Sequence, residues 1–315
     1  MADPVPHAVR LLAVERARAR RAHDWATADR LKAELEAAGW RVVDAGTLSS
    51  LEALPPAVIE VDGELRYGSS EAVPSVLPAP PSVPATVVLV TGDRAGLLPA
   101  AVDAVRRGSP TAQIVVVAND PPPDVAAEVA ALTAVEVVPL ARRLGAAAAR
   151  NAGIRRAAGS VVVLLNPRVE AAGDLVGDLA AALRAPGVGV AGLHGLDTGD
   201  LVHFEPVAPD ATSAVAVDGL AMAFRRADYV ARGPLDEHFT IDAYLDAWWS
   251  LTLRDVPEDA VFGVDVPGRA AVVASGYRLN GEEPAPPDQR LEKKHRYRLL
   301  KSFAARRDLL ETHGP

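Results

Sequence analysis

The stretch LGAAAARNAGIRRAAGSVVVLLN at residues 144–166 decides the fold. Its first part, residues 145–157, is rich in alanine and contains no proline, which favours a helix. Its second part, residues 160–165, is an apolar run of valine and leucine after one serine, which is typical of a strand buried on both faces. A helix that leads directly into such a strand predicts part of a βαβ unit.

Three further apolar runs precede this stretch and have the same character. They lie at residues 86–90, 113–118 and 135–140, and helical segments at 97–107 and 124–132 fit between them. Short apolar runs that alternate with helices predict a parallel sheet covered by helices. The expected fold class is therefore α/β, with a mostly parallel, Rossmann-like sheet and helices on both faces.

Three other segments flank this sheet domain, which is expected to span residues 85–288. Residues 1–69 predict a small module with a helical hairpin and short strands, and residues 289–315 predict a basic amphipathic helix. Residues 70–84 hold five prolines and predict an extended linker. The chain is thus expected to contain one small module, a linker, one large domain and a terminal helix.

Local signals within residues 1–69 place its elements. Asp24 is expected to cap the second helix of the hairpin, and Gly39 is expected to end it. Residues 40–44 and 58–67 are expected to form short strands, the latter turning at residues 62–63, which are Asp-Gly.

Composition excludes several functional classes. With 49% hydrophobic and 23% charged residues, the chain is globular and not disordered. Its net charge of −8 argues against attraction of the whole molecule to nucleic acid or anionic lipid. The absence of cysteine excludes disulfides, thiolate zinc sites, iron–sulfur clusters and a cysteine nucleophile.

The predicted location is the cytoplasm. No basic segment followed by an apolar run marks a signal peptide, and no apolar run reaches the roughly 18 residues of a membrane span. Arginine outnumbers lysine by 29 to 4, a usage typical of a G+C-rich genome.

Polar residues follow the predicted strands. Thr91 and Asp93 follow the first strand, Asn119 and Asp124 follow the second, and Asn166 follows the fourth. Ligands of open parallel sheets bind at the carboxyl ends of the strands, so these residues are candidates for a binding site. Because Asn and Asp are also favoured in turns, ordinary loop capping is the alternative interpretation.

The chain resembles family-two, GT-A-type glycosyltransferases of the actinobacterial type. Residues 144–166 are similar to the family segment G-x-a-x-a-R-N-x-G-i-x-x-A-x-G-d with the strand that follows it. Four other segments are similar to family motifs in the same order: residues 91–94 to t-y-N-R, 119–124 to D-N-x-S-x-D, 218–226 to g-x-x-m-x-f-R-R, and 233–239 to G-x-f-D-E-x-F. The resemblance covers roughly residues 85–275 and implies the GT-A fold.

The resemblance also implies an activity and a set of site residues. A nucleoside-diphosphate sugar would bind across the strand ends, and an acceptor hydroxyl would attack its anomeric carbon with inversion. The implied donor-binding residues are Thr91, Asp93, Asn119, Asp124, Arg150, Asn151, Asn166 and Arg168. Asp236, Glu237 and Trp249 are implied on the acceptor side, and Asp246 is implied as the base that deprotonates the acceptor.

The metal motif of the family is altered. Asn166, Pro167 and Arg168 stand where the family has its D-x-D, and Glu170 is the nearest acid and the one candidate ligand. A bound Mg²⁺ or Mn²⁺ is therefore doubtful. Arg168 is a candidate cation for the diphosphate, because guanidinium groups pair well with phosphate; the alternative is an ordinary salt bridge in solvent.

The base motif is partly kept. Asp246 aligns with the family aspartate, but Leu245 replaces the preceding glutamate, and residues 271–277 lack the histidine that many members carry. An N-cap of the helix that follows is the alternative role for Asp246. These losses favour a second hypothesis, in which the protein is an inactive glycosyltransferase-like scaffold for protein or RNA interaction.

Both ends of the chain offer basic surfaces. Residues 15–44 resemble the C-terminal helical end of cysteinyl-tRNA synthetases, and their arginines are candidates for binding RNA phosphates or for an ordinary solvated face. Residues 288–311 carry eight basic and four acidic residues, a net charge of +4. Their apolar positions, Tyr297 and Phe303 among them, are expected to pack on the sheet domain or to contact the inner face of a membrane peripherally.

Overall fold

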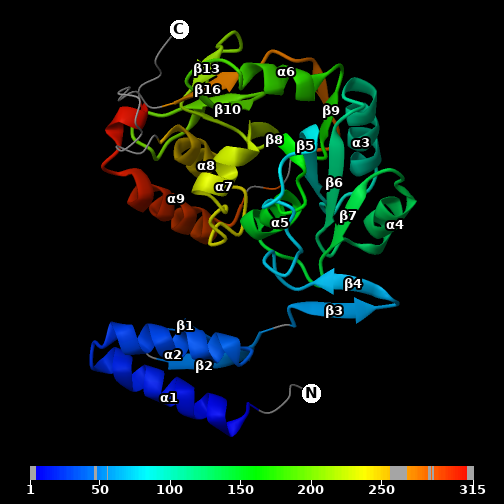
Figure 1. Ribbon diagram of the computed structural model, residues 1–315. Coiled ribbons are helices and arrows are strands. Elements are labelled where there is room, and N and C mark those ends of the chain that lie inside the picture. Colours follow the sequence, from blue (N-terminus) through cyan, green and yellow to red (C-terminus); the bar gives the residue numbers. More distant parts are fainter. Residues whose placement is uncertain are drawn as a thin grey trace. The chain divides into compact units, whose positions relative to one another are not determined.

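The computed structural model divides the chain into two compact units (Figure 1). The units are Met1–Ile59 and Glu60–Pro315. The residues that the structure describes are 5–45, 48–54, 56–255, 268–282, 285 and 287–310.

The smaller unit contains a helical hairpin and an antiparallel pair of strands. Asp24 accepts a hydrogen bond from the Thr27 backbone at 3.1 Å, and Gly39 has a φ of +80° just after the second helix, so both helix signals are confirmed. The elements are α1 (His7–Arg21), α2 (Trp25–Ala37), β1 (Trp40–Ala45) and β2 (Leu48–Ala53). The sequence LSSLEA of β2 lacks alternating polarity, so the sequence alone does not predict this strand. Contact of this unit with RNA stays a prediction.

A tight hairpin follows the smaller unit's strands along the chain. It consists of β3 (Val58–Val61) and β4 (Glu64–Tyr67), as the sequence predicts. Asp62 and Gly63 have positive φ values of 54° and 81°, which is the conformation that favours Asp-Gly in two-residue turns. Tyr67 and Leu140, both within the larger unit, form a parallel bridge.

An eight-stranded mixed sheet organises the larger unit (Figure 1). The strand order is β13-β16-β10-β15-β8-β5-β6-β7, and β8, β5, β6 and β7 run parallel. The bounds are β5 (Val83–Val90), β6 (Gln113–Ala118), β7 (Glu136–Pro139), β8 (Gly159–Leu165), β10 (Val188–Gly192), β13 (Ser213–Ala214), β15 (Ala221–Arg225) and β16 (Arg269–Val272). All four strands predicted from apolar runs are confirmed, and β15 pairs antiparallel with β8 and β10.

Helices cover both faces of this sheet (Figure 1). Alternate residues of β5 point to opposite cores: Val87 and Leu89 pack with α3 and α6, and Val88 packs with α5 and α8. Strands buried on both faces read as continuous apolar runs, which explains the sequence pattern. The helices are α3 (Leu97–Gly108), α4 (Pro123–Ala131), α5 (Ala146–Ile154), α6 (Leu175–Ala182), α7 (Arg226–Arg232), α8 (Leu245–Arg254) and α9 (Gln289–Phe303). The shorter elements are β9 (Val169–Ala171), β11 (Gly195–Asp197), β12 (Glu205–Pro206), β14 (Ala216–Val217), β17 (Tyr277–Leu279) and the 3-10 helix Arg307–Leu310.

The proline-rich residues 70–84 lie in the larger unit, and they contain turns in which the Val73 amide donates to the Ser70 carbonyl and the Ala79 amide to the Val76 carbonyl, each at 3.1 Å. The expected extended conformation is therefore wrong for this stretch. Val73 is fully buried, and its carbonyl accepts from Arg155 Nε at 2.7 Å. Arg226 Nη2 lies 2.8–2.9 Å from the carbonyl oxygens of Val76, Leu77 and Ala79. Because proline lacks a backbone N–H, this stretch cannot form a regular backbone ladder, and its carbonyls accept from arginines instead. The stretch expected to be a linker is therefore part of the larger unit.

The basic C-terminal segment is helical and amphipathic. His295, Leu299 and Phe303 of α9 are buried, whereas Tyr297 is 70% exposed, so the expectation that Tyr297 packs on the sheet domain is wrong. Among the described residues, no helix combines the length and the apolarity that crossing a bilayer requires.

Gly153 gives the first testable prediction, because it allows α5 to pack closely on the sheet. A Cβ at this position would meet Val88 Cγ1 and would lie 2.8 Å from Val117 Cγ2. We expect Gly153→Ala to lower the free energy of unfolding by about 1–3 kcal/mol, as overpacking of a core does. Urea unfolding measures the change. Gly173→Ala is the control, because its Cβ would meet nothing within 4 Å; equal stabilities of the two variants would contradict the account.

Candidate functional site

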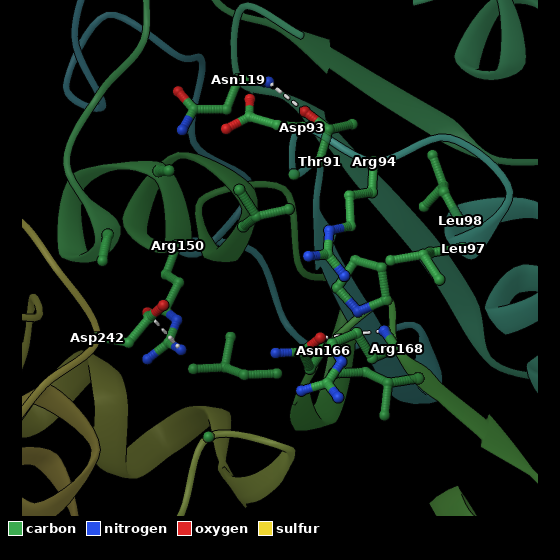
Figure 2. Close-up of a pocket in the computed structure, with 18 of the residues that line it drawn as sticks. Thr91, Asp93, Arg94, Leu97, Leu98, Asn119, Arg150, Asn166, Arg168 and Asp242 are labelled. Carbon is green, nitrogen blue, oxygen red and sulfur yellow. Dashed lines mark hydrogen bonds and ion pairs between the residues drawn. The ribbon is translucent and has the colours of Figure 1, made fainter. Parts of the chain in front are cut away.

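A pocket of about 640 Å³ opens at the carboxyl ends of β5, β6 and β8 (Figure 2). Such crevices are where open α/β sheets bind ligands. Six of the residues predicted for donor binding line it: Thr91, Asp93, Asn119, Arg150, Asn166 and Arg168. The parallel strands bring these side chains together from segments up to 77 residues apart.

The amide of Asn119 is engaged by the backbone. Its Oδ1 accepts from the Leu144 amide at 2.7 Å, and its Nδ2 donates to the Leu144 carbonyl at 3.1 Å. Its own backbone N–H donates to Thr91 Oγ1 at 2.9 Å, as Figure 2 shows. Asn119 therefore ties the end of β6 to the loop before α5, and one amide hydrogen and part of the oxygen remain for a ligand.

An ion pair joins two loops at the pocket. Arg143 contacts both carboxylate oxygens of Asp93, one of them at 2.9 Å. The hydrogen bonds from Arg143 lower the pKa of Asp93, so this carboxylate is ionised at neutral pH. Both side chains are more than half exposed. Because Asp93 pairs with Arg143, its carboxylate binds an arginine and not a metal ion.

A buried arginine with two carboxylates forms the wall of the pocket near α8. Arg150 Nη1 contacts Asp246 Oδ1, and Arg150 Nη2 lies 3.0 Å from Asp242 Oδ1 (Figure 2). Arg150 and Asp246 are each only 13% exposed, whereas Asp242 is 69% exposed. The carbonyls of Phe239 and Thr240 accept from the first turn of α5, which holds the loop with Asp242 against the helix that carries Arg150.

Asp246 has an unusual environment for a carboxylate. Burial raises its pKa to about 6, although the charge of Arg150 opposes this and the charge of Asp242 adds to it. A carboxylate with a raised pKa is better suited to accept a proton near neutral pH than an exposed one. The N-cap of α8 is Tyr244, without a side-chain hydrogen bond, so the capping role considered for Asp246 is wrong.

Gly219 lies between the pocket and this ion pair. It lines the pocket, and a Cβ on it would meet Asp246 Oδ2 and lie 3.2 Å from Arg150 Nη2. The preceding residue, Asp218, binds His194 Nδ1 at 3.0 Å, and the Tyr277 hydroxyl contacts His194 Nε2. Asp246 is thus separated from the pocket by one residue without a side chain.

The loop after β8 holds Arg168 at the other side of the pocket. The Asn166 Oδ1 accepts from the Arg168 backbone at 3.0 Å, as Figure 2 shows. The Arg168 Nε donates to the Asn280 carbonyl at 3.2 Å, and Nη2 is 3.5 Å from the Gly281 carbonyl. Arg168 is therefore held by backbone carbonyls, and the described residues contain no ion-pair partner for it.

The other predicted residues lie outside the pocket. Asn151 binds the backbone of Leu235, the Tyr229 hydroxyl and Glu237, and Glu237 also accepts from Ser70. Asp236 pairs with Arg298 and His238. Trp249 packs in the core. Asp124 is exposed at the start of α4, and Glu170 accepts from Arg278 and Asn280.

The donor groups of the pocket do not fit the divalent metal that the fold family implies. Hard cations such as Mg²⁺ and Mn²⁺ take several carboxylate or carbonyl oxygens. The lining carboxylates Asp93, Asp242 and Glu282 each pair with an arginine, and they come from separate loops. In the described part of the chain, no group of three or more His, Cys, Asp or Glu side chains could hold a metal ion.

Sequence reasoning missed four residues of the site. Arg94, Arg143, Gly219 and Asp242 line the pocket. Arg94 and Gly219 lie in segments that resemble family motifs, at residues 91–94 and 218–226, and Asp242 precedes Asp246 by four residues, so these three had a sequence signal. Arg143 had none, because its role depends on contacts between distant segments.

Comparisons with known proteins agree with this architecture. Residues 86–208 match the model of glycosyl transferase family 2. The crystal structure of GalNAc-T7 with UDP, GalNAc and Mn²⁺ is similar with a TM-score of 0.54 at 17% identity, over 70% of this chain and 48% of that chain. The crystal structure of S. aureus TarS residues 1–349 gives a TM-score of 0.49 at 11% identity, over 74% of this chain and 67% of that one.

No curated protein matches the sequence. The chain spans about half the length of the GalNAc-T7 chain that it resembles. The larger unit therefore has the GT-A fold of glycosyltransferases, and its residues 86–208 match glycosyl transferase family 2.

Proposed function

We propose that the protein transfers a sugar from a nucleoside-diphosphate donor to an acceptor hydroxyl, with inversion at the anomeric carbon. The observation that carries the proposal is the buried Arg150–Asp246 pair beside a pocket at the strand ends of a GT-A fold. The volume of about 640 Å³ lies within the range of about 300–1,000 Å³ that small-molecule sites have.

The donor has a defined place in this proposal. Its nucleoside lies near Thr91 and Asn119, where apolar side chains such as Leu98 and Val125 also line the pocket. Its diphosphate lies near Asn166 and the arginines of the pocket. Its sugar then points toward Gly219, which brings the anomeric carbon to the side of Asp246.

The chemical step uses Asp246 as the base. The acceptor hydroxyl gives its proton to the Asp246 carboxylate, and its oxygen forms a bond to the anomeric carbon. The bond between that carbon and the β-phosphate oxygen breaks, and the electron pair leaves with the nucleoside diphosphate. Arg150 positions Asp246 by its ion pair, and the absence of a side chain at Gly219 lets the Asp246 carboxylate pack directly against a residue that lines the pocket.

A second candidate function is a binding scaffold without transfer. Two observations favour it: the metal-binding carboxylates are absent from residues 166–168, and Asp246 is already committed to Arg150. Under this hypothesis the protein retains the fold and the pocket but does not catalyse sugar transfer. Detectable sugar transfer in an acceptor screen rejects it.

Ligand binding tests the proposal directly. Isothermal titration calorimetry with UDP-, GDP- and dTDP-linked sugars is expected to detect at least one donor, with the matching nucleoside monophosphate and the free sugar as controls that bind more weakly. The weaker binding is expected because each control lacks the groups that would contact the arginines or the base region. The absence of binding by every donor, with and without Mn²⁺, contradicts the proposal.

A further inference from the structure

The four arginines that line the pocket differ in the groups that hold them. Arg143 pairs with Asp93, and Arg150 pairs with Asp242 and Asp246. Arg94 and Arg168 are instead held mainly by main-chain carbonyls. Their positive charges are therefore available to a ligand in the pocket.

Three consecutive residues hold both guanidinium groups. Arg168 donates to the carbonyls of Asn280 and Gly281, and Arg94 Nη1 donates to the Glu282 carbonyl at 2.9 Å. Gly281 has a φ of +72°, and a Cβ on it would lie 3.6 Å from Arg94 Nη1. Figure 2 shows Arg94 and Arg168 on the same side of the pocket, next to Asn166. The 280–282 segment thus brings together arginines that are 74 residues apart in the sequence.

Both side chains retain unused hydrogen-bond donors. A guanidinium group has five N–H donors, and the contacts with the described residues use two of those of Arg168 and one of those of Arg94. The carboxylate of Glu282 lies 3.6 Å from Arg94, but it is 92% exposed and water screens it. The remaining donors can form charge-assisted hydrogen bonds with phosphate oxygens.

We infer that Arg94 and Arg168 bind the diphosphate of the donor in place of a divalent metal ion. This inference rests on the proposed function. The two guanidinium groups supply the same charge of +2 as one Mg²⁺ or Mn²⁺ ion, and they lie where the chain lacks metal-binding carboxylates. When the sugar–phosphate bond breaks, they stabilise the negative charge that develops on the leaving diphosphate.

Calorimetry in EDTA tests this inference with UDP and inorganic pyrophosphate as probes. The dissociation constants are expected to change by no more than about twofold when Mn²⁺ replaces EDTA. Arg94→Gln and Arg168→Gln are each expected to weaken binding by about 10–100-fold, because each removes a charge-assisted contact. Arg107→Gln is the control, since Arg107 is a largely exposed arginine outside the pocket.

The outcomes separate the two proposals. If nucleotide sugars bind but require Mn²⁺, or bind equally well to both glutamine variants, the arginine site is wrong and the proposed function stands. If pyrophosphate binds through the two arginines but no nucleotide sugar binds, the anion site is right and the proposed function is wrong. Circular dichroism establishes that the variants fold. The affinity of the wild type for these probes is also expected to fall with added salt, because salt screens the contacts between the arginines and the phosphates.

Discussion

Replacing Asp246 by Asn is expected to lower the rate of sugar transfer by about 100–10,000-fold, the usual contribution of a general base. The amide keeps the shape of the side chain but cannot accept the acceptor proton. Donor binding is expected to stay near that of the wild type, because Asp246 does not line the pocket. Initial rates with a saturating donor, together with calorimetry on the same variant, measure the two effects separately.

The pH dependence of the transfer rate provides a second test of Asp246 as the base. Because burial raises the pKa of Asp246 to about 6, the ionised base is lost as the pH falls through that value. The wild-type rate is therefore expected to rise with pH across this range. Asp103→Asn, a change of an exposed carboxylate on α3, is the control and should leave the profile intact. Unchanged turnover of the Asp246→Asn variant would refute its role as the base.

Replacing Arg150 by Met is expected to lower the free energy of unfolding by about 3–5 kcal/mol at neutral pH, the cost of leaving a buried charge without its partner. The variant keeps a buried Asp246 beside Asp242 and loses the cation that pairs with both. Urea unfolding followed by circular dichroism measures the effect. The double variant Arg150→Met with Asp246→Asn is expected to recover most of the loss, because it removes the unpaired charge as well.

The loss of stability in the Arg150→Met variant should also depend on pH in a defined direction. Burial raises the folded-state pKa of Asp246 above its ordinary value, and removal of Arg150 takes away an opposing contribution. The folded variant therefore binds a proton more readily than the unfolded chain, so its stability falls as pH rises through the folded-state pKa. The stability difference from the wild type is expected to shrink on acidification from about pH 8 to about pH 5. A difference independent of pH would show that Asp246 carries no buried charge.

Much of the motif that carries the family resemblance serves the fold rather than the chemistry. Gly153 allows α5 to lie against Val88 and Val117, and Gly159 lies against the backbone of β5. Asn151 binds the loop at Leu235 and the hydroxyl of Tyr229. The motif residues that line the pocket are mostly apolar, and Arg150 and Asn166 are the two polar ones among Leu144, Ala146, Ala149, Arg150, Leu164, Leu165 and Asn166. The motif therefore predicts the architecture better than it predicts which side chains meet a ligand.

The sheet and the position of the pocket followed from local patterns. Continuous apolar runs mark strands buried on both faces, and the rule for parallel sheets then places Thr91, Asn119 and Asn166 at one edge. These inferences need only the chain's own periodicity.

The finer site depended on contacts between distant segments. Arg94 donates a hydrogen bond to Glu282, which is 188 residues away in the sequence, and Arg150 donates one to Asp246, which is 96 residues away. No local propensity encodes such contacts. Residues 236–237, predicted on the acceptor side, contact Arg298, Ser70 and Asn151. The charge pattern of the pocket, in which main-chain carbonyls hold Arg94 and Arg168, therefore required the structure.

The most direct test of the account is a crystal structure of the protein with the nucleoside diphosphate that binds tightest, grown in EDTA. We expect electron density for the nucleotide at the ends of β5, β6 and β8, with the diphosphate oxygens in contact with Arg94 and Arg168 and no metal between them. Empty strand ends, or a nucleotide bound elsewhere on the protein, would contradict the central claim that this pocket is a nucleotide-sugar site.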